Sequence, residues 1–228
     1  MPLPFALVAA VSSQLADSGY ETLLVMGEFL ATFTVALVGV LTLSVAVLWF
    51  HAPLGLFSVL QAVSAPTMLA FATRSAVASL PAMMEGLERL KFGKLQVELV
   101  TPLSVVLVRF GPIMFYFVAG IFIAELYDRQ LSALDLILIS VASVMAGLAS
   151  AGATGIANVQ MIAIVCGYLK LPLEACIVLF IAVDVISDTL RTILLVVVNM
   201  AYTAVICPVE NDEESVKPNA VEANATQN

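Results

Sequence analysis

The strongest constraint on the fold is a run of about thirty mostly apolar residues, 21–50, that contains few charges and no proline. A helix needs about 20 apolar residues to cross about 30 Å of hydrocarbon, so this run predicts a full, tilted transmembrane helix. Composition points the same way, because 61% of the 228 residues are apolar and only 11% are charged. Ordinary soluble domains lie far from these values. We therefore expect an all-α integral membrane protein whose main solvent is the lipid bilayer.

Two segments depart from the pattern of a simple membrane-spanning helix. Residues 53–92 form two apolar arms around a polar break at Arg74, and neither arm is expected to be long enough to span. Residues 132–169 form two arms around a stretch of small and polar residues, 149–158. Irregular backbone at membrane depth is tolerated only where it lines a polar cavity. Both segments are therefore predicted to be re-entrant helical hairpins.

Each predicted hairpin is followed by a long helix. The first of these helices, 96–127, contains Arg109, Gly111 and Pro112 near its middle, so we expect it to be unwound there; the second is 172–207. The order of hairpin and helix occurs twice, which predicts an internal, inverted repeat. In secondary transporters such paired interruptions mark the substrate site near the bilayer midplane.

The remaining division of the chain follows from these elements. Residues 1–19 are expected to be the end of a scaffold helix, and residues 20–207, beginning with a helix at 20–50, a transport domain. Residues 208–228 are acidic and polar, which predicts a disordered aqueous tail. The basic cluster at residues 89–94 belongs in the cytoplasm by the positive-inside rule, and counting crossings from it puts the C-terminus there too.

The last apolar helix carries the most informative polar residues. They are Asp184, Asp188, Arg191, Thr192 and Asn199, whose spacing places most of them on one helical face. Each charge near mid-membrane costs at least about 2.5 kcal/mol, so these charges need partners or a polar cavity. Arg191 can bind a carboxylate through two parallel hydrogen bonds, and Asp188 can receive an ammonium group. Together they suit an amino-dicarboxylate, although Asp188 and Arg191 could also neutralise each other as a purely structural pair.

Four motifs, taken in order, carry a family resemblance. They are the serine-containing segment 73–81, the Pro-Leu pair 102–103, the small-residue segment 149–158 and the Asp-x-x-x-Asp-x-x-Arg-Thr pattern at 184–192. In this order and spacing the chain resembles the C-terminal half of the sodium:dicarboxylate and glutamate symporter family. The resemblance implies an elevator carrier, in which two hairpins gate a solute held between the broken helix and the last helix.

The resemblance also implies roles for individual residues. Arg191 would hold the distal carboxylate of the substrate, Asp188 would bind its amino group, and Thr192 would assist. The backbone around Ser75 and Gly155 would contact the remaining carboxylate.

Residues of both hairpins can also have supporting or structural roles. Arg74 would support the site electrostatically, and it needs an acidic partner, for which Asp184 and Asp188 are candidates. Gly152 and Gly155 could equally be residues that let two helices pack closely.

The chain departs from the family at the positions that bind sodium. The family's Asn-Met-Asp-Gly-Thr reads Val-Arg-Phe-Gly-Pro at 108–112, and two later polar positions also differ. The degenerate ion positions are Val108, Arg109, Phe110, Gly111, Leu195 and Asn199. Hard cations need several oxygen ligands, which valine, phenylalanine and leucine side chains do not supply. The sequence therefore predicts altered or lost coupling, with Arg109 standing in for the ion and transport sodium-independent, proton-linked or exchange-type.

The expected function is secondary active transport of small dicarboxylates or of acidic or neutral amino acids. The alternative is a non-transporting or truncated membrane homologue that acts as a partner subunit. No HExxH or GxSxG motif occurs, so an enzyme is not expected. We expect no organic cofactor, no confident metal site, sodium or a proton as coupling ion, and no nucleic-acid partner. We expect a homotrimer if upstream scaffold helices are present. The sequence leaves open whether the chain is a fragment, the product of a mis-started reading frame or one half of a split carrier.

Overall fold

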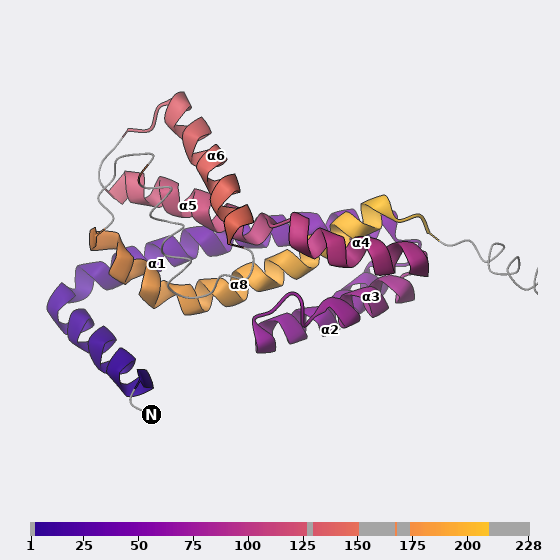
Figure 1. The fold of residues 1–228 in the computed structure, drawn as a ribbon, viewed down its shortest axis with the longest axis horizontal. Helices are drawn as coiled ribbons and strands as arrows, with labels where there is room; N and C mark the ends of the chain where they lie inside the picture. Colours follow the sequence, from indigo (N-terminus) through magenta and orange to yellow (C-terminus); the bar gives the residue numbers. More distant parts are fainter. Residues whose placement is uncertain (1–2, 127–129, 151–166, 168–173, 210–228) are drawn as a thin grey trace, which may run out of the picture.

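The computed structural model describes residues 3–126, 130–150, 167 and 174–209. Within these ranges the chain is helical apart from its turns and one isolated pairing of two extended residues. The predicted all-α class is therefore confirmed for the described residues. The helices are α1 (Leu3–His51), α2 (Leu56–Thr73), α3 (Leu80–Arg89), α4 (Lys94–Leu107), α5 (Phe110–Leu126), α6 (Ala133–Ala149) and α8 (Glu174–Ile206) (Figure 1).

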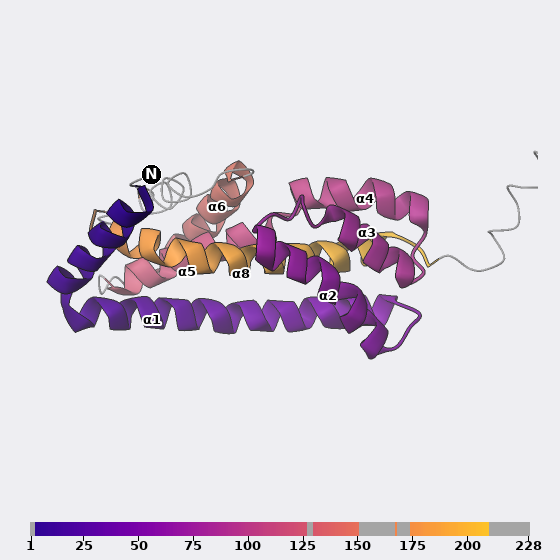
Figure 2. The same ribbon diagram turned by 90° about the horizontal axis from the view of Figure 1, so that it is seen from below.

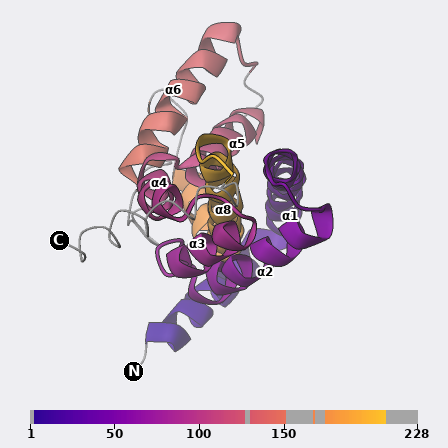
Figure 3. The ribbon, with the colours of Figure 1, turned by 90° about the vertical axis from the view of Figure 1, so that its right-hand side faces the viewer.

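Helix α8 lies at the centre of the arrangement. It contacts α1, α2, α3, α4 and α5, and Figure 3, which looks along the longest axis, shows the other helices around it. Helix α6 packs on α5 and projects away from the centre (Figures 1 and 3). The polar residues predicted on α8 therefore lie where several helices meet.

The predicted break in the helix after the first hairpin is confirmed. Helix α4 ends at Leu107, Val108 has a non-helical φ of −91° and ψ of 79°, and α5 begins at Phe110. Pro112 lies in the first turn of α5, where a proline is tolerated because that N–H would have no partner within the helix. The break is local, since both halves continue as regular helices.

The segment predicted as the first hairpin folds as two helices that pack against each other. Helices α2 and α3 are joined by the turn at 74–79, and Pro81 lies at the start of α3. In Figures 1 and 2 this turn lies at about the same level along α8 as the α4–α5 break. Both interruptions thus approach the same part of the central helix.

Four segments of the described chain are long and apolar enough to cross a membrane. They are Gly27–His51, Leu56–Thr73, Lys94–Glu125 and Ile186–Ile206. The second of these is α2, so the expectation that neither arm of the first hairpin reaches spanning length is wrong for α2, whose 18 residues up to the break at Arg74 are apolar enough on average to span. It holds for α3, which has 10 residues.

The ends of the chain are described only in part. Helix α1 is continuous across the expected boundary between 1–19 and 20–50, and Figure 2 shows its N-terminal part bent away from the remainder. At the other end, Val209 pairs with Phe92, and the Gly93 N–H donates to the Pro208 carbonyl at 3.2 Å. The start of the tail is thus held to the beginning of α4. The rest of the tail, from 210, lies outside the described residues.

The second predicted hairpin is described only through its first arm. Helix α6 begins with a capping box, in which Ser132 and Asp135 each satisfy the other's backbone N–H. Residues 151–166 and 168–173 lie outside the described residues, and so do the predicted tip and Gly155. The re-entrant placement of the hairpins and the inverted repeat stay predictions.

Candidate functional site

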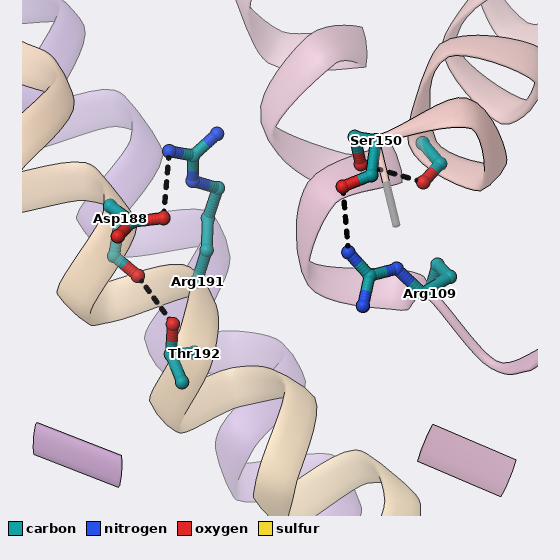
Figure 4. A network of polar contacts seen from close by, with 6 residues as sticks. Arg109, Ser150, Asp188, Arg191 and Thr192 are labelled. Carbon is teal, nitrogen blue, oxygen red and sulfur yellow. Dashed lines mark hydrogen bonds and ion pairs between the residues drawn. The ribbon is translucent and has the colours of Figure 1, made fainter. Parts of the chain in front are cut away.

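Three of the predicted site residues on α8 form a connected group (Figure 4). A guanidinium nitrogen of Arg191, Nη2, lies 3.3 Å from Asp188 Oδ1, and the Thr192 hydroxyl donates to the Asp188 carbonyl at 2.8 Å. The Arg191 side chain is only 4% exposed, whereas that of Asp188 is 25% exposed. The group therefore offers a buried cation beside a carboxylate that is accessible from one side.

Arg191 is held in place by an aromatic ring. Its Cζ lies 4.2 Å from the centre of the Phe115 ring, a cation–π geometry that stabilises a positive charge away from water. The Phe115 ring meets the rings of Phe29 and Phe33 edge-on, at centroid distances of 5.8 and 5.5 Å. Aromatic side chains from α1 and α5 thus fix the position of the guanidinium on α8.

Gly111 permits the close approach of α5 to α8. A Cβ added at this position would lie 2.5 Å from the Arg191 carbonyl oxygen, well inside the 3.4 Å of an ordinary contact. Any larger residue would therefore push the start of α5 away from the backbone of Arg191. Gly111 is the one residue of the Asn-Met-Asp-Gly-Thr motif that the chain retains at 108–112, and this close approach gives a steric reason for a glycine there.

Arg109 lies at the α4–α5 break and reaches the end of α6. Its Nη2 donates to the Ser150 carbonyl at 3.2 Å, and its Nε is buried without a hydrogen-bond partner among the described residues. Figure 4 shows Arg109 beside Ser150 on one side of the view, and Arg191 beside Asp188 on the other. The α4–α5 break and the end of the first arm of the second predicted hairpin are thus joined by a charged side chain.

Asn199 connects α8 to the same break. Its side-chain nitrogen donates to the Val108 carbonyl at 3.3 Å and to the Leu195 carbonyl at 2.7 Å, and the residue is fully buried. Two carbonyl oxygens therefore converge on an amide N–H₂ group. Phe110, another predicted ion position, lines an apolar hollow of about 280 Å³ between α1 and α8, and 40% of the residue is exposed.

Two further predicted site residues, Arg74 and Ser75, lie at the turn between α2 and α3. Arg74 ends α2 in the left-handed conformation, with φ 51° and ψ 34°, and is exposed. Among the described residues it makes no ion pair with Asp188; the side chain of Asp184 lies outside them. The Ser75 hydroxyl accepts from the Ala78 N–H at 3.3 Å and so stabilises the turn itself.

The structure thus connects the α4–α5 break to α8 at two places. Gly111 packs against the backbone of Arg191, and Asn199, about two turns further along α8, bonds Val108. Arg74 and Ser75 lie at the turn between α2 and α3. Sequence reasoning missed Phe115, because nothing distinguishes it from the other aromatic residues of α5. Only the fold shows that it faces Arg191.

Comparison with known families decides the class of this molecule. Residues 2–207 match the profile of the sodium:dicarboxylate symporter family. The chain belongs to this family. Together with the apolar helices, this membership identifies an integral membrane protein of a transporter family.

Two curated relatives are similar to this symporter-family chain. It is 26% identical over 191 residues to the proton/sodium-glutamate symport protein of Bacillus subtilis, which covers 83% of this chain and 44% of the relative. It is 34% identical over 124 residues to the putative sodium-dependent excitatory amino acid transporter glt-3 of Caenorhabditis elegans, covering 54% of this chain and 23% of the relative. The chain thus matches less than half the length of either relative.

Proposed function

We propose that this chain is the transport half of a secondary active carrier for small dicarboxylates or for acidic or neutral amino acids. The observation that carries the proposal is the buried Arg191 beside the partly exposed Asp188, in the middle of an apolar helix. Intramembrane charges of this kind are functional by default. One relative is named as a glutamate symport protein and the other as a putative excitatory amino acid transporter, which supports an amino-dicarboxylate solute.

The contacts of Arg191 suit the exchange of one carboxylate for another. Its 3.3 Å contact with Asp188 is longer than the usual 2.7–2.9 Å of a charge-assisted hydrogen bond. A substrate carboxylate that makes two shorter bonds can therefore displace Asp188, which then becomes available to a substrate ammonium group. Thr192 assists by fixing the backbone of Asp188, and the second positive charge, on Arg109, further favours an anionic solute.

We propose the movement that the family resemblance implies. Residues 20–207 would move as a transport domain against a scaffold that includes 1–19, with the α2–α3 pair as the first re-entrant hairpin. The backbone around Ser75 and Gly155 would contact the substrate, and Arg74 would support the site. Assembly as a homotrimer and a cytoplasmic C-terminus belong to the same proposal.

Cation coupling is altered in this proposal. The Asn199 amide directs N–H donors at the carbonyl oxygens of Val108 and Leu195, so donors occupy a place where a cation would need acceptors. Phe110 offers no oxygen ligand, and Arg109 adds a fixed positive charge nearby. Transport would then proceed without sodium, with protons or by exchange.

The test is uptake by the full chain reconstituted into liposomes. Liposomes loaded with unlabelled aspartate or succinate are given the radiolabelled compound in sodium or in choline buffer of equal ionic strength. We expect similar uptake in the two buffers and none with Arg191→Ala. Steep sodium dependence would contradict altered coupling, whereas absence of both uptake and binding would contradict the carrier and favour a non-transporting partner.

A further inference from the structure

Most hydroxyl groups in the apolar helices satisfy themselves locally. The hydroxyls of Thr34, Thr42 and Thr67 each donate to the carbonyl four residues earlier, at 2.7 Å. This backbone bond is the usual solution for threonine in a helix that has no water around it. Thr101 and Thr203 differ, because both are fully buried and neither hydroxyl has a hydrogen-bond partner among the described residues.

The register of α4 and α8 places these hydroxyls at one interface. The two helices are in contact and run in opposite directions, since Gly93 bonds Pro208 at one end and Asn199 bonds Val108 at the other. Thr203 lies one turn beyond Asn199 on α8, on the same face.

The opposing face of α4 is also polar. Thr101 and Ser104 are both buried on α4, at seven and four residues before the break at Val108. Within the described chain α4 packs only on α3 and α8, so its buried face is covered by these two helices. A row of polar side chains therefore runs along α4 and α8 toward the break.

Several polar atoms of this row lack a hydrogen-bond partner within the described part of the protein. Three of its buried oxygens, Thr101 Oγ1, Thr203 Oγ1 and Asn199 Oδ1, have no partner among the described residues. A buried polar group without a partner destabilises a protein, and an internal water molecule is the common remedy. The three atoms together call for more than one water, because Asn199 and Thr203 lie on successive turns of α8 and Thr101 lies on α4.

A hollow lies beyond one end of the row. It measures about 490 Å³, lies where α4 begins and α8 ends, and its lining includes Lys94, Gln96 and Glu98. Asn199 lies nine residues of α8 from Pro208, which lines the same hollow, or about 14 Å at 1.5 Å per residue. A file of water molecules that reaches the hollow has to pass beside the buried Val97 and Cys207.

We propose that the α4–α8 interface holds a file of water molecules ordered by Thr101, Ser104, Thr203 and Asn199, and that this file carries protons between the hollow and the α4–α5 break. A hydronium ion in the hollow gives up one proton. Each water or hydroxyl accepts a proton and passes its own onward, so that water at the break receives one proton and no other bond changes. The role in proton transfer rests on the proposed function, whereas the water file does not.

Cysteine labelling tests the water file without requiring transport. In the full chain with its three native cysteines replaced, Thr203→Cys is compared with Ala204→Cys, its equally buried neighbour in an apolar cluster. Only a solvated, ionisable thiol reacts with a charged methanethiosulfonate reagent, so we expect Thr203→Cys to react about tenfold faster or more. Equal rates would show that the interface is dry and would overturn the proposal.

Proton counting tests the role of the file. The full chain is reconstituted with a pH-sensitive dye, and the protons that move per labelled substrate are measured. Thr101→Val with Thr203→Val keeps the side-chain shape and removes both hydroxyls, so the ratio should fall, while Thr42→Val, whose hydroxyl is satisfied locally, should keep it. An unchanged ratio in the double variant would overturn the proton role. A chain that transports nothing would overturn the proposed function and the proton role with it, while labelling still decides the water file.

Discussion

Gly111→Ala is expected to disturb both stability and substrate binding. The new Cβ would lie 2.5 Å from the Arg191 carbonyl, so the start of α5 must move by about 0.9 Å to restore the 3.4 Å of an ordinary contact. Overpacking of this size destabilises by about 1–3 kcal/mol. The movement also shifts Phe115, which lies on α5 over Arg191, and a misplacement near 1 Å can lower binding or rate by about 100-fold.

Gly39→Ala is the matched control. Nothing lies within 4 Å of a Cβ at Gly39, which is in α1, so this variant gains helix propensity, up to about 1 kcal/mol, without a clash. Unfolding in detergent and binding of labelled aspartate are measured for both variants. We expect Gly111→Ala to be less stable than Gly39→Ala by about 1–4 kcal/mol and to bind more weakly. Equal stability and affinity would refute the close approach of α5 to α8.

Three further variants or measurements test the polar connections around the break. Asn199→Asp replaces the amide donor with a carboxylate beside the Val108 carbonyl, which adds an oxygen ligand for a cation. In a sodium titration, sodium should then increase substrate binding by this variant, and binding that does not change with sodium would contradict the role of the amide. Arg109→Leu removes the positive charge beside the break, so affinity for divalent anions should fall more than affinity for monovalent ones. Unchanged affinities would argue against an electrostatic role of Arg109. Burial raises the pKa of the Cys207 thiol, so in the folded protein the thiol stays protonated to higher pH than an exposed cysteine. Iodoacetamide at pH 8 should therefore modify Cys207 more slowly in the folded protein than in the unfolded chain, and equal rates would contradict its burial.

Much of the fold could be predicted because few backbone structures can cross a lipid bilayer. Apolar runs of spanning length gave the long helices, and Arg109 with Pro112 indicated the break that the structure shows between α4 and α5. The end of α2 at Thr73 agrees with the predicted break at Arg74, but the capacity of this arm to span was missed because its scattered polar residues still leave a high mean hydropathy.

The candidate site could be predicted only as a set of residue types. The spacing of Asp188, Arg191 and Thr192 on one helix predicts their mutual contacts, because side chains three and four residues apart meet. Contacts between helices depend on packing that no local pattern encodes. The ring of Phe115 over Arg191 and the hydrogen bond from Asn199 to the break are of this second kind.

Equilibrium binding of radiolabelled aspartate to the purified full chain tests the carrier most directly, with succinate as competitor. Wild type should bind saturably, and Arg191→Ala should weaken binding by about 30-fold or more, which corresponds to about 2 kcal/mol for the loss of a buried charge partner. Arg89→Ala removes an exposed arginine, 63% accessible and paired with Glu85, and should bind like wild type. Binding that is equal in all three proteins, or absent from wild type, would contradict a substrate site at Arg191.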